Sequence, residues 1–275
     1  MECDLLELLV MPNETWTYSH TQLALWKLCK RRYYMRYVLG RKEPTTANMA
    51  AGTWLAQEPI ETYYQGRTFD DIAWQSIWAN FLAEFGGTDD YDDPIFTLDL
   101  AKRILAAYKA SPVQGKVVEI EKRYVKEFAG GYQYVSIPDL VVEREQGRIA
   151  FDLKLKTFNQ TKAGDTFWLK PELSPFDDQG VGQAVCSGSR AFGQIQFWVG
   201  KRDGVVHGPF YVEHQLGGTM AQEWMDETKA EIEDIYAYTG AYKTLPFPKN
   251  DQACHAFGRP CSWLANCKFG FEVKA

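Results

Sequence analysis

The sequence lacks any long hydrophobic run, because no stretch approaches the roughly 18 apolar residues that a membrane-spanning helix needs. It also lacks positive charge at its start, where MECDLLELLVMPNETW carries acidic side chains in place of the basic ones of a secretory signal. Internal repeats, low-complexity tracts and flexible linkers are absent too. We therefore expect a cytoplasmic protein that does not associate with membranes and forms a single domain.

Positive charge is in deficit over the whole chain, with 30 Lys and Arg against 36 Asp and Glu. A protein that coats nucleic acid over its entire surface relies on Lys and Arg to neutralise phosphates, so this composition argues against that class. A local basic surface is still compatible with this composition. Aromatic residues make up 15% of the chain, which supplies large core side chains and also faces on which bases stack.

Residues 1–112 read as a helical part. Ser19 is placed to cap a helix that continues to residue 38, since Trp26, Cys29, Tyr33 and Tyr37 recur every three or four positions and form one buried stripe. Apolar periodicity predicts further helices over 50–65, 71–85 and 98–110.

Basic residues occupy the rest of the first helix. A solvated helix face is one interpretation and a face that contacts phosphates is the other, and the sequence leaves both open. If the second holds, the DNA-binding residues are Lys30, Arg31, Arg32 and Arg36.

Residues 113–216 read as a core sheet. The segments KVVEIEKRYVKEF, YQYVSIPDLVVE and RIAFDLKLK predict three consecutive strands in a meander, because they are rich in β-branched and aromatic residues and are separated by turn residues. A helix over 177–190 and two more strands, QIQFWVG and VVHGPFYVEH, follow. Residues 217–275 add a helix to about residue 238 and a cysteine-bearing tail. The predicted fold class is α/β (α+β), a central mixed β-sheet flanked by helices.

Charged residues alternate with apolar ones in RIAFDLKLK, so Asp152 and Lys154 project from the same face of one strand. Asp139, which follows Pro138, comes 13 positions before Asp152 (152 minus 139), a separation that suits a hairpin. Two neighbouring carboxylates repel unless a cation joins them, and oxygen ligands suit Mg²⁺ or Mn²⁺. A surface ion pair between Asp152 and a lysine is the alternative.

Pro138-Asp139 followed by Asp152-Leu153-Lys154, across a turn between two strands, resembles the signature of the PD-(D/E)XK nuclease superfamily. SHTQLALWKLCKRRYYMRY resembles the opening helix of its RecB-like branch. Glu121 falls on the strand before the first acidic motif, and Gln179 and Gln183 fall on the glutamine-containing helix. The resemblance thus extends from Ser19 to Cys267.

The resemblance implies a metal-dependent deoxyribonuclease, an exonuclease on single-stranded DNA or DNA ends. It makes Asp139, Asp152 and the Leu153 carbonyl metal ligands and Lys154 the residue that orients and activates the attacking water. Such a metal neutralises the phosphodiester and lowers the pKa of bound water. Gln179 and Gln183 join the catalytic set.

Histidine is scarce and absent from one expected place. RecB-like nucleases usually carry a metal-binding His on the second helix in a pattern like Gly-x-x-x-His, whereas GTWLAQEPIETYY has none. Gln57, Glu58 or Glu61 is then the substitute, and Glu61 is the predicted metal ligand. The tyrosine that usually follows the glutamine motif is also missing. The four histidines lie elsewhere, where surface or packing roles are expected: His20, His207, His214 and His255.

Cysteines cluster near the end of the chain as C-x6-C-x5-C, and Cys29 lies on the first helix. In a reducing compartment clustered cysteines indicate metal or redox chemistry before disulfides. The pattern resembles the 4Fe-4S arrangement of RecB-like exonucleases, including CRISPR-associated adaptation nucleases. A zinc site and unligated thiols remain open, although closely spaced zinc-ligand pairs are missing. The predicted cluster ligands are Cys29, Cys254, Cys261 and Cys267, with Cys3 and Cys186 as inert thiols.

Three functional hypotheses follow. The first is an enzyme that hydrolyses DNA. The second is a nuclease-fold DNA-binding module that has lost turnover, which the missing histidine favours. The third is a subunit that acts within a CRISPR-adaptation or recombination complex.

Overall fold

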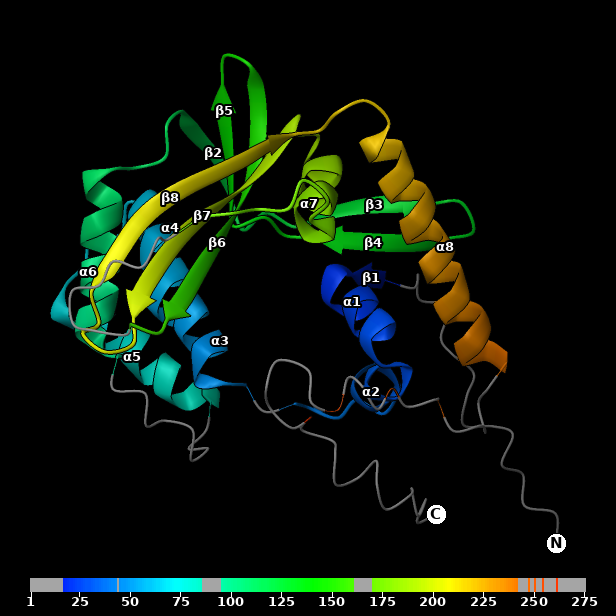
Figure 1. The fold of residues 1–275 in the computed structure, drawn as a ribbon, viewed down its shortest axis with the longest axis horizontal. Helices are drawn as coiled ribbons and strands as arrows, with labels where there is room; N and C mark the ends of the chain where they lie inside the picture. The colour runs from blue at the N-terminus through cyan, green and yellow to red at the C-terminus, as the bar shows by residue number, and fades with distance from the viewer. Residues whose placement is uncertain are drawn as a thin grey trace, which may run out of the picture.

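The structure is a computed structural model that describes residues 17–43, 45–85, 95–160 and 170–241, together with Phe247, Asn250, Cys254 and Cys261. Figure 1 shows the fold. The helical elements are α1 (His20–Leu28), α2 (Lys30–Tyr33), the π-helix η1 (Tyr34–Val38), α3 (Ala47–Ala51), the π-helix η2 (Gly52–Gln57), α4 (Glu58–Tyr64), α5 (Asp71–Phe85), α6 (Leu98–Ala110), α7 (Asp178–Ser187) and α8 (Met220–Ala241). The strands are β1 (Thr17–Ser19), β2 (Lys116–Ile120), β3 (Tyr124–Phe128), β4 (Tyr132–Ser136), β5 (Leu140–Arg144), β6 (Gly147–Phe158), β7 (Ala191–Gly200) and β8 (Val206–Gln215).

The strands form two mixed sheets. A five-stranded sheet has the order β2-β5-β6-β7-β8, and a three-stranded sheet has the order β1-β4-β3. Strands β6 and β7 are parallel, whereas the other pairs of the larger sheet are antiparallel. A parallel pair needs a crossover connection, and α7 supplies it between β6 and β7. The predicted mixed sheet flanked by helices is confirmed.

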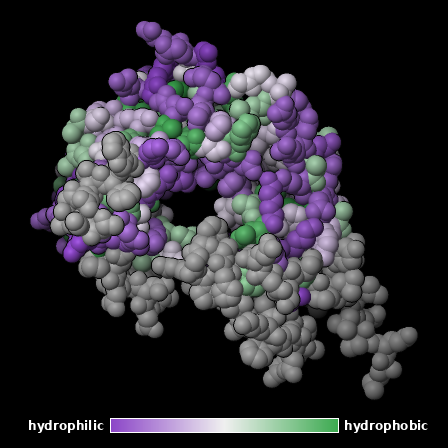
Figure 2. Space-filling view, viewed as in Figure 1, coloured by the Kyte–Doolittle hydropathy of each residue, from purple (hydrophilic) through white to green (hydrophobic). Residues whose placement is uncertain are grey.

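Two hydrophobic cores lie on opposite faces of the larger sheet. Alternation along β7 shows the division, because Ile195 and Phe197 join the core beneath α3 to α6, while Phe192 joins the core of α1, α7 and α8. Figure 1 shows these two groups of helices on either side of the molecule. In Figure 2 an opening separates them, and its upper border is mostly hydrophilic.

The predicted three-strand meander is wrong in its connections. Glu121 has a positive φ of 44°, which ends β2 and directs the chain into β3 of the other sheet. Pro138 has no backbone N–H to continue a ladder, so β4 ends before it and β5 begins after it. The three predicted strands are therefore five. β3 and β4 form a hairpin in the smaller sheet, while β2 pairs with β5.

The helix predicted from the Ser19 cap to residue 38 is present but not continuous, because Cys29 is extended, with φ −162° and ψ 107°. The chain thus forms α1 and α2 on either side of this residue. Ser19 occupies the N-cap position, but its side chain makes no capping hydrogen bond. The buried stripe is confirmed in part: Trp26, Cys29 and Tyr33 are buried and Tyr37 is half-buried.

The other predicted helices are confirmed. Helices α5 and α6 have the predicted bounds, and α3, η2 and α4 together cover 47–64. Helix α7 contains Gly180 and Gly182, at which a Cβ atom would come within 2.3 Å of Phe192 and 2.7 Å of Trp224. These two glycines let α7 lie close to β7 and α8. None of the described helices is long and apolar enough to span a membrane.

Candidate functional site

Asp139 and Asp152 lie side by side at the end of the β5–β6 pair that is far from the connecting turn. The two strands are antiparallel and Leu140 pairs with Phe151, so Asp139 and Asp152 are the next residues on each strand. The Leu153 amide donates a hydrogen bond of 2.5 Å to Asp139 Oδ2. Both aspartates are 7% exposed. The predicted hairpin therefore brings the two carboxylates together.

Lys154 completes the predicted set on the same face of β6. Its amine forms an ion pair with Asp152 and donates to Gln179 Oε1 at 3.4 Å. Burial alone would lower the pKa of Lys154, but attraction to Asp152 and Asp139 outweighs burial and raises it. Lys154 is therefore a cation at neutral pH.

Helix α7 brings both predicted glutamines to Asp152. Gln179 Nε2 donates to Asp152 Oδ1 at 3.0 Å, and Gln183 Nε2 approaches the same oxygen at 3.4 Å. Gln179 thus contacts both Asp152 and Lys154, which fixes the two side chains relative to each other.

Helix α4 and the π-helix before it supply the other side of the site. Gln57 Nε2 donates to Asp139 Oδ1 and to Glu121 Oε1, at 3.0 Å each. Glu61 is four residues after Gln57 and so lies on the same helical face, where it is 2% exposed. Glu58, the third possible substitute for the histidine, pairs with Arg67. The structure therefore brings Glu61 and Gln57 to the aspartates.

Lys154, which pairs with Asp152, does not offset the burial of Glu61 and Asp139. Burial raises the pKa of Glu61 to about 8, and repulsion from Glu121 adds to the shift. Burial also raises the pKa of Asp139 well above its usual range, with repulsion from Asp152 as the next cause. Within the described structure, Glu61 Oε1 is buried and has no hydrogen-bond partner. Such an oxygen needs either a proton or a cation.

The donor set fits a hard divalent cation. Carboxylate oxygens are the ligands that Mg²⁺ and Mn²⁺ prefer, and the buried, unpartnered Glu61 oxygen is available to one. No group of three His, Cys, Asp or Glu side chains in the described parts has a ready-made metal geometry. Gln57 separates Glu121 from Asp139, and Lys154 pairs with Asp152. Metal binding would thus require these side chains to shift.

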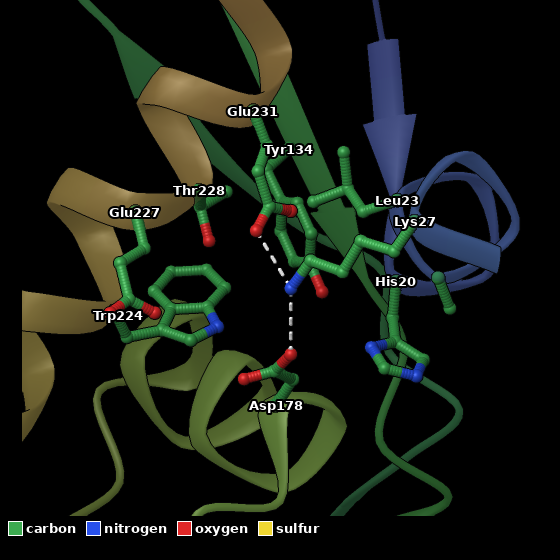
Figure 3. Close-up of a pocket in the computed structure, with 10 residues that line it drawn as sticks. His20, Leu23, Lys27, Tyr134, Asp178, Trp224, Glu227, Thr228 and Glu231 are labelled. Carbon is green, nitrogen blue, oxygen red and sulfur yellow. Dashed lines mark hydrogen bonds and ion pairs between the residues drawn. The ribbon is translucent and has the colours of Figure 1, made fainter. Parts of the chain in front are cut away.

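Its own N-cap and the helices α1 and α8 hold α7 in place. Asp177 caps α7 by accepting a hydrogen bond of 3.0 Å from the Gly180 amide. Figure 3 shows Lys27 of α1 between Asp178 of α7 and Glu231 of α8, at 3.0 Å and 2.7 Å. Burial lowers the pKa of Lys27, but hydrogen bonds to Glu231 and Asp178 outweigh burial and raise it. The pocket drawn in Figure 3 is thus a junction of α1, α7 and α8. It positions Gln179 and Gln183 by holding the start of α7.

The predicted DNA-binding residues have partners within the protein. Arg32 donates to both oxygens of Glu43, at 2.6 Å and 3.0 Å, and Arg36 contacts the same carboxylate at 3.4 Å. Lys30 pairs with Asp234 at 3.2 Å, and Arg31 donates to the Phe247 carbonyl at 2.8 Å. These contacts give the basic side chains a structural role, while contact with phosphates stays a prediction.

Two tail cysteines are described together with Cys29. Cys29 is buried, and the Cys261 amide donates to the Cys254 carbonyl at 2.7 Å. Asn250 connects this tail to the break after α1, since its Nδ2 donates to the Leu28 carbonyl at 3.0 Å and its own carbonyl contacts Cys254 Sγ at 3.7 Å. Cys3 and Cys267 lie outside the described residues.

The described histidines are not part of the site. His214 Nε2 contacts the Leu173 carbonyl at 2.8 Å, and His207 packs on Phe158. Burial lowers the pKa of His20, which lines the junction in Figure 3. None of these three hydrogen-bonds to Asp139 or Asp152. His255 lies outside the described residues.

Comparison with known proteins relates the chain to others through its fold. No protein-family model matches it, and no curated protein matches it either. Among solved structures, a "Putative exonuclease" from Eubacterium rectale is similar with a TM-score of 0.50 and 14% identity, over 94% of each chain. A structure of SSO0001 matches 78% of this chain and 85% of its own at 15% identity, with a TM-score of only 0.29.

Proposed function

We propose that this chain is a metal-dependent nuclease that hydrolyses phosphodiester bonds in DNA, acting as an exonuclease on single strands or ends. The carrying observation is that Asp139, Asp152 and Glu61 gather at one buried place beside Lys154, with a Glu61 oxygen unpartnered among the described residues. The likeness to a structure named as an exonuclease supports the same reaction class.

Asp139, Asp152, Glu61 and the Leu153 carbonyl would hold Mg²⁺ or Mn²⁺. The cation supplies neutralisation of the phosphodiester and a bound water of lowered pKa. Lys154 keeps its proton at neutral pH, so it orients the attacking water and stabilises negative charge that develops on the phosphate. Gln179 hydrogen-bonds to both Lys154 and Asp152 and keeps the two side chains in place for this reaction.

We also propose that Cys29, Cys254, Cys261 and Cys267 hold a structural 4Fe-4S cluster. The contact of Asn250 with both Leu28 and Cys254 supports a junction between the tail and α1. Zinc or free thiols are the alternatives. A subunit that acts on DNA within a CRISPR-adaptation or recombination complex is the alternative to an enzyme that acts by itself.

The test is a time course on end-labelled single- and double-stranded DNA with Mg²⁺, Mn²⁺ or a chelator, using protein purified without oxygen. Asp152→Asn and Lys154→Gln should each reduce cleavage by about 100-fold or more, the usual cost of removing one charge-stabilising group. Lys102→Gln, on α6 at 5.7 Å from the Trp74 ring, is the control and should cleave normally.

Equal cleavage by Asp152→Asn and its parent would contradict the site. A parent that binds DNA without cleaving it would favour the second hypothesis, a DNA-binding module that has lost turnover. The replacement of the expected histidine by Glu61 is compatible with that loss.

A further inference from the structure

A strip of basic and aromatic side chains continues from the candidate site across β6, β7 and β8. Lys154, Lys156 and Phe158 occupy every second position of β6 and therefore share one face of the strand. The β6–β7 register places Lys156 beside Trp198. Trp198 pairs in turn with His207 of β8. We call Lys156, Phe158, Trp198 and His207 the basic-aromatic strip. Its members are half-buried, and they face away from the core beneath α3 to α6.

The Lys156 amine lies against an aromatic ring, 5.2 Å from the Trp198 ring centroid. Among the described residues no carboxylate forms an ion pair with it. Burial lowers the pKa of Lys156, and repulsion from Lys154 lowers it further, while Glu172 beyond ion-pair distance acts against both. An anion bound between the two lysines would relieve this repulsion.

Trp198 is held as a rigid platform. Its indole Nε1 donates to Gln196 Oε1 at 3.2 Å, and Gln196 Nε2 donates to the Glu172 carbonyl at 3.0 Å. Gln196 is fully buried, which fixes this chain of hydrogen bonds. Phe158 lies beside the platform, with ring centroids 6.4 Å from Trp198 and 5.7 Å from His207. A fixed ring loses little entropy when a flat ligand stacks on it.

We infer that the basic-aromatic strip binds single-stranded DNA next to the cleaved bond, with a phosphate at Lys156 and unpaired bases against Trp198 and Phe158. This inference rests on the proposed nuclease function and names the part of the strand that the site recognises. Lys154 and Lys156 are about 7 Å apart along β6, at roughly 3.3 Å per residue. Successive phosphates of an extended strand match two such cations. In a duplex the bases stack on each other, so their faces are closed to Trp198.

Figure 1 and Figure 2 support this path, because β6 runs along the border of the opening between the two groups of helices. The strip begins two residues beyond the lysine of the candidate site, so a strand lying on it continues directly from the scissile phosphate. The basic face of α2 and η1 is less suited, since Arg32 and Arg36 are paired with Glu43.

Binding in the presence of a chelator tests the inference without cleavage. Fluorescence anisotropy would measure the affinity for labelled oligothymidine, for an abasic strand of equal length and for a duplex, over a range of salt. Lys156→Gln should reduce the salt slope for both single strands by about 0.7, the contribution of one phosphate contact. Trp198→Leu should weaken oligothymidine binding roughly 5- to 150-fold and leave the abasic strand unchanged, since base stacking is lost.

Lys109→Gln is the matched control, because Lys109 also lies over aromatic rings, at 5.3 Å from Tyr63 and 5.5 Å from Phe69, but on α6. Its salt slope should equal that of the parent. Trp198→Phe keeps an aromatic face and should retain most of the affinity. If Trp198→Leu does not fold, photocrosslinking of the unaltered protein to oligodeoxyuridine carrying 5-iodouracil decides, with crosslinks expected at Trp198 or Phe158.

The inference is overturned by an unchanged slope for Lys156→Gln, by equal loss of abasic and oligothymidine binding in Trp198→Leu, by crosslinks confined to other elements, or by preference for the duplex. Failure of the proposed function looks different. A parent that never cleaves, but whose strip variants bind as expected, loses the nuclease assignment and keeps the strip. A parent that cleaves with fully active strip variants keeps the nuclease assignment and loses the strip.

Discussion

Glu61 shows how burial at one residue prepares a site for a cation. Its carboxyl group is surrounded by Glu121, Glu58 and the amide of Gln57, and it is almost inaccessible to solvent. Without a cation the group stays protonated near neutral pH, because ionisation would create a buried negative charge beside Glu121 and Glu58. A divalent ion removes that constraint, so metal and proton compete for the same oxygens.

The free energy of unfolding of metal-free protein should therefore fall as pH rises. The pKa of Glu61 is about 8 when folded against an ordinary 4.5, so the folded chain binds more protons between these values and loses this stability across them. Asp139 shifts in the same direction. Thermal unfolding with a chelator should show a lower Tm at pH 8 than at pH 5, and Glu61→Gln should flatten this dependence.

Adding Mn²⁺ at pH 8 should raise the Tm of the parent more than it raises the Tm of Glu61→Gln, since a ligand that binds the folded state stabilises it. Identical pH profiles for the parent and Glu61→Gln would remove Glu61 from the acidic cluster.

Helix α7 is the element that couples the core to the site. Its cap, Asp177, occupies the first turn before Gln179, and its body fits against β7 and α8 only because Gly180 and Gly182 lack side chains. Asp177→Ala should lower the free energy of unfolding in urea by about 1 kcal/mol, the usual value of an N-cap. It should also slow cleavage, because Gln179 lies within the same turn.

Asp177→Asn is the control for this prediction, since asparagine caps a helix as well as aspartate does. Equal destabilisation by both substitutions would show that the charge of Asp177 matters more than its capping bond.

The first helical segment, split at Cys29, presents a different case, because its arginines are partly used for folding. Arg32 and Glu43 are 24% and 10% exposed and share two hydrogen bonds. Arg32→Gln should lower the free energy of unfolding by about 1.5 to 3 kcal/mol, the value of hydrogen bonds to a charged group. Arg36→Gln should cost less, since Arg36 makes one longer contact and is 35% exposed.

The salt dependence of DNA binding separates the structural role from phosphate contact. If Arg32 acts only within the protein, the slope for Arg32→Gln stays that of the parent. If Arg32 contacts a phosphate, the slope falls by about 0.7.

At the scale of the whole molecule, the proposed cluster would join the break between α1 and α2 to the cysteine-bearing tail. Protein prepared without oxygen should be brown and contain about four irons per chain, as a 4Fe-4S cluster requires. Cys29→Ser or Cys261→Ser should bleach the protein and lower its Tm, because metal binding contributes directly to folding.

Cys186→Ser is the matched control, since burial raises the pKa of the Cys186 thiol to about 12 and keeps it a neutral, poor ligand. It should change neither colour nor Tm. One tightly held zinc in a colourless preparation would replace the cluster with a zinc site, and a stable metal-free protein would remove the junction.

The sequence by itself determined the local features of this protein. The periods of its apolar residues predicted α5 and α6, and the alternation around Asp152 placed Lys154 on the same face. It also predicted the β5–β6 hairpin that joins Asp139 to Asp152. These features depend on neighbours within a few residues, or on one short turn, so a single chain is enough to read them.

Only the tertiary structure decided which distant segments meet. Glu121 and Pro138 divide apparently continuous strands between two sheets, and the pairing of β2 with β5 depends on packing of the whole chain. The same packing places Gln57 and Glu61, and not Glu58, beside the two aspartates. It also places Lys156 over Trp198, which lies on a strand some 40 positions away. The physical reason is that such contacts are selected by burial and charge compensation across the folded chain, which no local pattern encodes.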